Sequence, residues 1–276
     1  MNSDLPTTEQ RNPRSSHLGE MSAREVVDLM GAEDVAVLTA LETAAGELAA
    51  AAERVAETYL AGGRTVLFGS GTSGRLVLQE VAELPPTFGL DPAAISAYCS
   101  GPNTLEPVAR DEDDADAAVN LVARLGLGSR DTVIGVAASG TTPFACAAVA
   151  GANRRGSYTI GIANNDGTPL LTTARLGIHL ATGPEVLTGS TRLKAGTAQK
   201  IALNRITTAA MVLADRVQSN HMVEVRGTIS KLRDRARRIV CDLRGVDADL
   251  ADAVLAAHDW YAADALRALD AGWTPR

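Results

Sequence analysis

The sequence predicts an α/β fold built on a doubly wound, mostly parallel five-stranded sheet. Five short apolar runs alternate with loops and helical patterns, at residues 65–68, 95–99, 132–136, 159–163 and 176–181. Such an alternation is typical of βαβ units with right-handed crossovers. The composition agrees, because 46% of the residues are hydrophobic and only 3% are aromatic. A core of Ala, Val, Leu and Ile suits helices packed on a buried parallel sheet.

The region before the first strand is predicted to be helical after an extended arm. Residues 1–20 contain turn formers but little apolar periodicity. Ser22 and Glu25 have the spacing of a capping box, which predicts a short helix to about Met30. Apolar positions then recur at helical spacing over 33–61, which predicts one long amphipathic helix that ends at Gly62-Gly63.

Further helices are predicted between and after the strands. Helical patterns follow at residues 75–84, 115–125, 190–216, 224–243, 248–257 and 260–271. We therefore expect an arm at 1–20, one α/β domain with flanking helices at 21–243, and a small helical segment at 244–276.

Charge and cysteine usage limit the partners and the compartment. With 26 basic and 33 acidic residues the formal net charge is -7, which disfavours nucleic acid or an anionic membrane as a partner. The first residues lack the apolar region of a secretory signal, and no apolar run reaches 18 residues. Cys99, Cys146 and Cys241 show no C-x-x-C spacing, which fits a reducing compartment. We expect a cytoplasmic protein, and the four histidines show no metal-ligand spacing, so we expect no metal.

Two glycine- and hydroxyl-rich loops predict a site for an anionic ligand. The first, 69–74, follows a predicted strand and supplies the hydroxyls of Ser70, Thr72 and Ser73. Glycines let backbone N–H groups approach an anion, and the helix that follows adds positive potential at its N-terminus. No Lys follows the last glycine, so the loop is not a Walker A motif. The alternative interpretation of this loop is an ordinary strand-to-helix turn.

The second loop, 138–143, repeats this arrangement after another strand. Ser139, Gly140 and Thr142 lie where a helix cap is expected. Two such turns in one sheet favour a shared site for a small phosphorylated sugar.

Two acidic positions are candidates for proton transfer. Glu83 lies at the end of the predicted helix 75–84, where the negative end of the helix dipole favours a protonated carboxyl group that can donate its proton. Glu112 belongs to an acidic run, 111–114, before the predicted helix 115–125. In both cases a solvated acid at a helix end is the alternative, and the spacing in the run does not choose which carboxylate would act as a general base.

Several blocks of the sequence together resemble one family, the bacterial N-acetylmuramic acid 6-phosphate etherases, which are built on a sugar isomerase (SIS) domain. The matching blocks are residues 8–13, 69–76, 83–89, 112–114, 137–140 and 183–200. The last block is the longest and the most specific. One departure is Thr141, which stands where the family usually has Arg.

The resemblance implies cleavage of the D-lactyl ether of N-acetylmuramic acid 6-phosphate by elimination and then hydration, without a metal or organic cofactor. It implies that Glu83 protonates the leaving ether oxygen and that Glu112 is the base at C2 of the sugar. It also implies a homodimer with the site near the subunit contact. The residues implied to hold the 6-phosphate are Ser73, Ser139 and Thr142, and those implied at the pocket rim are Glu185, Ser190 and Lys194.

Two other functions fit the same loops. A non-catalytic regulator that senses a phosphosugar would keep the hydroxyls but would not need two carboxylates. A phosphosugar isomerase would also abstract a C2 proton but would need no lactyl group. Release of lactate separates the etherase from both.

Overall fold

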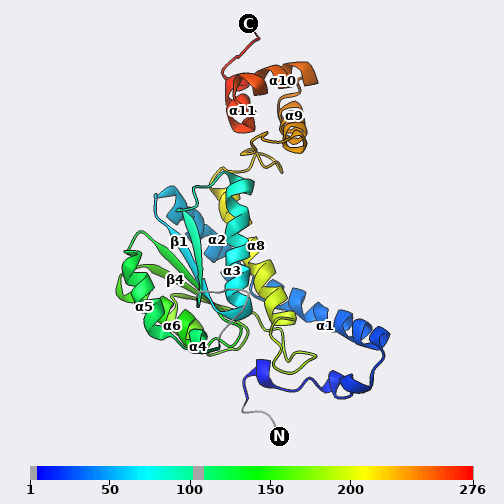
Figure 1. Cartoon of the computed structure of the whole chain (residues 1–276), viewed down its shortest axis with the longest axis vertical. Helices are drawn as coiled ribbons and strands as arrows, with labels where there is room; N and C mark the ends of the chain where they lie inside the picture. Colours follow the sequence, from blue (N-terminus) through cyan, green and yellow to red (C-terminus); the bar gives the residue numbers. More distant parts are fainter. Residues whose placement is uncertain (1–4, 102–108, 276) are drawn as a thin grey trace. The chain divides into compact units, whose positions relative to one another are not determined.

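The five-stranded parallel sheet that the sequence predicts is confirmed in a computed structural model, which describes residues 5–101 and 109–275 (Figure 1). The strand order is β2-β1-β3-β4-β5, and every neighbouring pair is parallel. The strands are β1 (Thr65–Gly69), β2 (Ile95–Cys99), β3 (Thr132–Val136), β4 (Tyr158–Ala163) and β5 (Leu176–His179). All residues of β1 and β3 are buried, as expected for the centre of a sheet covered on both faces.

The strand order creates a switch point between β1 and β3. These strands are neighbours, with Gly69 paired to Val136 at their carboxyl ends. From β1 the chain crosses to β2 on one side, and from β3 it crosses to β4 on the other. The loops after β1 and β3 therefore diverge, and such a point is where open α/β sheets bind ligands.

The helices have the following bounds in the structure. Those before and within the sheet region are α1 (Ala23–Thr43), α2 (Ala45–Leu60), α3 (Gly71–Phe88), α4 (Ala109–Glu112), α5 (Ala115–Arg124), α6 (Pro143–Arg154) and α7 (Pro169–Thr173). Those after it are α8 (Lys194–Leu213), α9 (Ser230–Arg244), α10 (Ala248–Ala257) and α11 (Ala262–Asp270). Three short 3-10 helices, η1 (Thr7–Glu9), η2 (Pro13–Ser15) and η3 (Leu18–Glu20), lie in the arm that was expected to be extended.

Right-handed crossovers place these helices on the two faces of the sheet. The connections through α5, α6 and α7 run in one direction along the strand order, and the connection through α3 runs in the other, which puts α3 on the opposite face. Figure 1 shows this separation, with α5 and α6 on one side of the strands and α3 on the other. A core of Phe68, Val122, Val133 and Phe144 joins α5 and α6 to the sheet.

The region before β1 forms two helices, as predicted, but the break between them lies at Ala44 and not at residues 30–33. Ser22 and Glu25 form the predicted capping box at the start of α1. The predicted long helix is interrupted at Ala44, and α1 and α2 are bent by 59° at this break. Among the described residues no single helix is long and apolar enough to cross a bilayer, although this bent pair meets the length and composition criteria when taken together.

Helix α3 is longer than predicted at both ends. It starts at Gly71 and continues through Pro85 and Pro86 to Phe88, whereas proline usually marks a helix end. The turn is still closed after the prolines, because the Gly89 N–H donates to the Pro85 carbonyl at 2.9 Å. Gly89 has a φ of +64°, a left-handed conformation that ends the helix.

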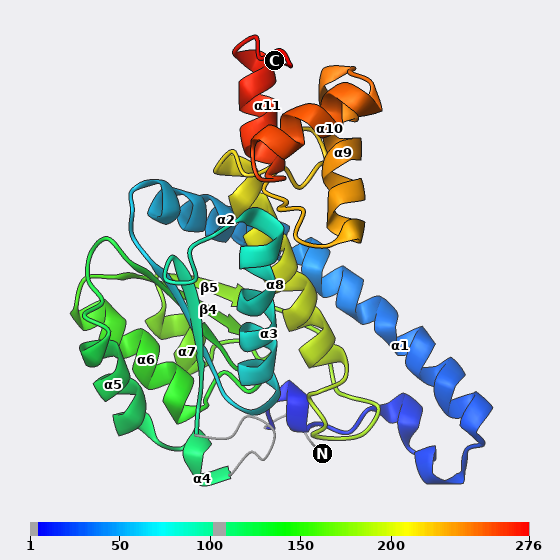
Figure 2. The same ribbon diagram turned by 45° about the horizontal axis from the view of Figure 1, so that its top comes forward.

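The chain divides into two compact units, which we describe separately. The first contains residues up to Ala82 together with Ala93–Ala210, and it holds the whole sheet. The second contains Glu83–Pro92 and the chain from Met211 onward. Its core joins α9, α10 and α11 through residues that include Ile239, Val254 and Leu266, so this unit is larger than the segment 244–276 expected from the sequence (Figure 2).

Candidate active site

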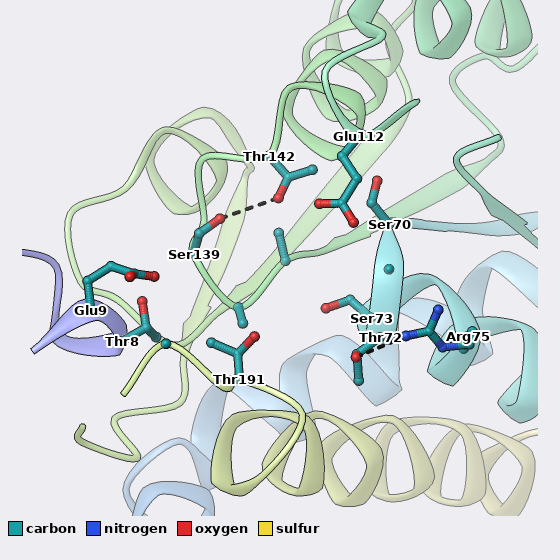
Figure 3. A pocket seen from close by; sticks show the side chains of 14 residues that line it. Thr8, Glu9, Ser70, Thr72, Ser73, Arg75, Glu112, Ser139, Thr142 and Thr191 are labelled. Atoms are coloured by element: carbon teal, nitrogen blue, oxygen red, sulfur yellow. Dashed lines mark hydrogen bonds between the residues drawn. The ribbon is translucent and has the colours of Figure 1, made fainter. Parts of the chain in front are cut away.

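A cavity of about 320 Å³ lies at the carboxyl ends of β1 and β3, within the first unit (Figure 3). Its lining is dominated by hydroxyl groups and contains few charged side chains. The lining residues are Thr8, Glu9, Ser70, Gly71, Thr72, Ser73, Arg75, Glu112, Ala137, Ala138, Ser139, Thr142, Gly189 and Thr191. Both loops that the sequence singled out therefore reach one cavity.

The loop after β1 contributes three hydroxyls and the start of α3. Ser70, Thr72 and Ser73 all line the cavity. The Ser70 side chain is 7% exposed, and its Oγ has no hydrogen-bond partner among the described residues. Because a buried hydroxyl without a partner is costly, its position in the cavity wall suggests that a ligand completes its bonding. Ser73 Oγ donates to Gln199 Oε1 at 2.8 Å.

The loop after β3 presents two hydroxyls beside the start of α6. Ser139 and Thr142 line the cavity, with their hydroxyl oxygens 3.3 Å apart. Thr142 is the N-cap residue of α6, yet its side chain makes no capping bond and instead pairs with the Ser139 hydroxyl, on the side that lines the cavity. Gly140 does not line the cavity but shapes the loop, because its φ is +71° and a Cβ there would lie 2.2 Å from Thr168 Oγ1.

Glu112 is the carboxylate of the acidic run that faces the cavity. Its side chain lines the wall opposite Ser139 and next to the loop after β1. Burial raises the pKa of Glu112, the charge of Asp113 raises it further, and Arg75 acts in the opposite direction. Asp113 and Asp114 are exposed, and Asp114 caps α5 by accepting the Ala117 N–H at 2.8 Å. The run thus contains both an inward-facing carboxylate, Glu112, and a solvated helix start, the two arrangements that the sequence left as alternatives.

Comparisons with known proteins identify the family. A family model described as SIS domain matches residues 32–164, which include both loops. The chain is 43% identical over 244 residues to the N-acetylmuramic acid 6-phosphate etherase of Geobacillus thermodenitrificans (strain NG80-2), covering 88% of this chain and 83% of that one. The chain belongs to the N-acetylmuramic acid 6-phosphate etherase family. The etherase of Mycolicibacterium smegmatis is 40% identical over 267 residues, which is 96% of this chain and 90% of the relative.

Solved structures agree on the fold. Phosphoheptose isomerase GmhA from Neisseria gonorrhoeae superposes with a TM-score of 0.54 at 18% sequence identity, covering 68% of this chain and 98% of that one. At this identity the likeness supports the SIS-type fold of the etherase family and nothing finer. The fold class predicted from the sequence is therefore confirmed.

Glu83, implied by the etherase resemblance as the catalytic acid, does not line the cavity. It is exposed and belongs to the second unit. It is also not at a helix end as expected, because α3 continues to Phe88. Twelve residues, or about three helical turns, separate it along α3 from Gly71 in the cavity wall.

The side chains of Glu185 and Lys194, which the resemblance implies at the pocket rim, are not among those that line the cavity. Glu185 is 1% exposed and accepts hydrogen bonds from the backbone N–H groups of Lys194 and Ala195, at 3.1 and 2.9 Å. Lys194 is 3% exposed, and its Nζ lies 2.6 Å from Glu33 Oε2. Burial raises the pKa of Glu185, although the two N–H bonds and Lys194 oppose this. Both residues anchor the start of α8 instead of contacting the cavity.

The remaining rim residue, Ser190, lies between two residues that do line the cavity, Gly189 and Thr191. Thr141 is exposed and is not part of the cavity lining, and its N–H donates to Ser139 Oγ at 3.2 Å. Among the described residues there is no group of three or more His, Cys, Asp or Glu that could hold a metal ion.

The sequence reasoning missed the contribution of the N-terminal arm. Thr8 and Glu9 line the cavity, and so does Arg75 at the start of α3. The block 8–13 was matched to the etherase family, but nothing in its local pattern indicates a contact with loops more than 130 residues away. The resemblance of this block to the etherase family is the feature of the sequence that could have indicated a role for the arm in the site.

Proposed function

We propose that this protein cleaves the D-lactyl ether of N-acetylmuramic acid 6-phosphate, giving N-acetylglucosamine 6-phosphate and D-lactate. The observation that carries the proposal is Glu112, a half-buried carboxylate that faces a hydroxyl-lined cavity at the switch point of the sheet. The chain belongs to a family whose relatives are etherases, and this supports the activity over that of a regulator or an isomerase.

Glu112 serves as the base in this proposal. In the ring-opened sugar the C1 aldehyde acidifies the C2 proton, and Glu112 removes it. The electron pair forms the C2–C3 double bond while the C3–O bond to the lactyl group breaks, and an acid gives a proton to the departing oxygen. Water then adds across the double bond: its oxygen bonds to C3 as it gives a proton back to the acid, and Glu112 returns its proton to C2. The raised pKa of Glu112 makes it a stronger base at neutral pH than an ordinary carboxylate.

The phosphate binds at the hydroxyl-rich loops in this proposal. Ser139 and Thr142 present hydroxyls at the start of α6, where the helix dipole favours an anion. Ser70 and Ser73 supply further hydroxyls from the facing loop. No cofactor is needed, since proton transfers alone complete the reaction.

A second copy of the chain supplies the acid, Glu83, in this proposal. The exposed position of Glu83, outside the lining of its own chain's cavity, is compatible with a homodimer in which each cavity receives the partner's carboxyl group. We further propose a cytoplasmic location, which the three free cysteines would suit.

The experiment measures D-lactate release from N-acetylmuramic acid 6-phosphate in oxygen-18 water. We expect lactate from the wild-type protein, with the label at C3 of the sugar. Glu112→Gln should lower kcat by at least about 100-fold, as expected for loss of a general base. A folded wild-type protein that releases no lactate, or that only isomerises a hexose 6-phosphate, would overturn the proposal.

Mixed dimers test the origin of the acid. Glu83→Gln and Glu112→Gln chains are each purified, unfolded together in equal amounts and refolded. If the two carboxylates come from different chains, half of the dimers have one intact site, so about a quarter of the wild-type activity returns. If both come from one chain, the mixture stays as inactive as its components.

A further inference from the structure

The cavity contains a second carboxylate, Glu9, on the side away from Glu112 (Figure 3). Among the described residues that line the cavity, the charged side chains are Glu9, Arg75 and Glu112. Glu9 is contributed by η1, in the N-terminal arm, and not by either of the loops that follow the strands. The proposed reaction gives it no role.

The arm is fixed to the site by a pair of buried side chains. The Thr8 backbone N–H donates to Asn165 Oδ1 at 3.0 Å, and Asn165 Nδ2 donates to Thr8 Oγ1 at 2.9 Å. Asn165 Nδ2 also lies 3.1 Å from the carbonyl oxygen of Ser139, in the loop after β3. Thr8 and Asn165 are 2% and 3% exposed. The residue next to Glu9 is thus held to the same loop that presents Ser139 to the cavity.

The Glu9 carboxylate itself is uncommitted. Its side chain is exposed, and no hydrogen bond or ion pair joins it to any other described residue. It lies beside Gly189, where a Cβ would be 3.5 Å from Glu9 Oε2. A free carboxylate accepts strong hydrogen bonds from neutral donors and repels anions.

We propose that Glu9 is a substrate-binding residue that accepts a hydrogen bond from a hydroxyl or the acetamido N–H of the sugar. This inference rests on the proposed function for the identity of the ligand. The substrate carries two anionic groups, the phosphate and the lactyl carboxylate, and neither can approach Glu9 without repulsion. Glu9 therefore contacts the uncharged part of the sugar, which fixes how the sugar faces Glu112 on the other side of the cavity.

The test compares two ligands by titration calorimetry, N-acetylglucosamine 6-phosphate and inorganic phosphate. Glu9→Gln keeps the shape of the side chain but removes its charge. We expect the Kd for the sugar phosphate to rise by about 10-fold, in line with the loss of a charge-assisted hydrogen bond. The Kd for inorganic phosphate should stay unchanged or fall, because a nearby negative charge is gone. In turnover assays KM should rise by more than kcat falls.

The matched control is Glu20→Gln, which removes an exposed carboxylate from the same arm outside the cavity. It should leave both Kd values unchanged. Equal sugar-phosphate affinity in Glu9→Gln and wild type would overturn the inference, and so would an equal weakening of both ligands, which indicates a structural role. Failure of the wild type to release lactate would count against the proposed function instead, since these binding measurements do not require turnover.

Discussion

The Glu112 carboxylate occupies the space that a side chain at Gly71 would need. A Cβ placed on Gly71 would lie 2.6 Å from Glu112 Oε1, and the φ of Gly71 is +53°. Glycine at this position therefore serves two purposes, because it allows the left-handed turn into α3 and leaves room for the proposed base. The position of the base depends on a residue in a different loop, 41 positions earlier in the chain.

Gly71→Ala should inactivate the enzyme with a modest loss of stability. The added methyl group must push Glu112 aside, and a displacement of about 1 Å in a catalytic group costs about 100-fold in rate. The left-handed conformation adds a cost of about 1–3 kcal/mol to the folded state. Lactate release and urea unfolding measure the two effects.

The matched control is Gly31→Ala, in the interior of α1, where a Cβ would meet nothing within 4 Å. It should stabilise the protein by about 0.5–1 kcal/mol and leave kcat/KM unchanged. If Gly71→Ala retained wild-type kcat/KM, the placement of Glu112 as the base would be contradicted.

The acid limb of the kcat/KM profile should report the ionisation of Glu112. Its pKa is raised above the ordinary 4.5, first by burial and then by Asp113, while Arg75 lowers it. Asp113→Asn should therefore move the acid limb to lower pH, and Arg75→Gln should move it to higher pH. Shifts in the same direction, or no shift in either variant, would show that another group controls this limb.

The same raised pKa makes a prediction about stability. Because the folded state favours the protonated carboxyl group, its stabilising contribution is complete below about pH 4.5 and is lost as the pH rises through the folded-state pKa. Glu112→Gln removes this penalty. The Tm of the variant relative to wild type should therefore be higher at pH 7 than at pH 4. A difference that is constant with pH would contradict the raised pKa.

Removing one partner of the buried pair Lys194–Glu33 should destabilise the fold strongly, whereas replacing both charged residues should destabilise it much less. Their side chains are 4% and 9% exposed, and Asn12 Nδ2 also donates to Glu33 at 2.7 Å. Burial would raise the pKa of Glu33, but the bonds from Lys194 and Asn12 outweigh it and hold the pKa below its ordinary value. Lys194→Met removes the buried cation and leaves the Glu33 carboxylate with the mostly exposed Arg14, 2.8 Å from its Oε1. The loss should approach the cost of breaking a buried pair, about 3–5 kcal/mol in urea unfolding.

A double-mutant cycle separates this coupling from simple loss of packing. The double variant Lys194→Met with Glu33→Gln should recover most of the loss, because the one charge left unpaired is that of Arg14, which is mostly exposed to solvent. Arg24→Met, which breaks an exposed pair with Asp28, should cost less than about 1 kcal/mol. Additive losses in the double variant would mean that the two charges are not coupled.

The strands and the two loops could be predicted because their signals are local. Each strand is a short apolar run, and each glycine-rich loop directly follows one. The bend at Ala44 has no such signal, because Ala44 suits a helix as well as its neighbours do. The passage of α3 through Pro85 contradicts the usual local rule.

The parts of the site that could not be predicted depend on long-range contacts. Thr8 meets Asn165, 157 positions away, and this contact brings Glu9 to the cavity. Glu185 and Lys194 stand in a polar, glycine-rich segment that is typical of an exposed loop. They are buried because each has a partner elsewhere in the fold. Glu185 accepts a backbone N–H at the start of α8, and the Lys194 ammonium donates to Glu33.

Two buried amide side chains, those of Asn164 and Gln199, connect the Ser73 hydroxyl in the loop after β1 to the backbone at Leu180. Asn164 Nδ2 faces the carbonyl oxygen of Leu180 at 2.9 Å, and a carbonyl can only accept. Asn164 Oδ1 must therefore face a donor, which is Gln199 Nε2 at 3.0 Å, and Gln199 Oε1 then accepts from Ser73 Oγ at 2.8 Å. Each amide orientation is fixed by the one before it.

Gln199→Leu should therefore destabilise the protein by about 1–3 kcal/mol, because it leaves Asn164 Oδ1 buried without a donor. It also releases the Ser73 hydroxyl from its acceptor, so the affinity for N-acetylglucosamine 6-phosphate should change, whereas an effect on packing alone would leave the affinity constant. Thr197→Ala, on the exposed face of α8, should change stability by less than about 0.5 kcal/mol. Wild-type stability in Gln199→Leu would mean that the amide chain does not support the fold, because a buried Asn164 oxygen without a donor is destabilising.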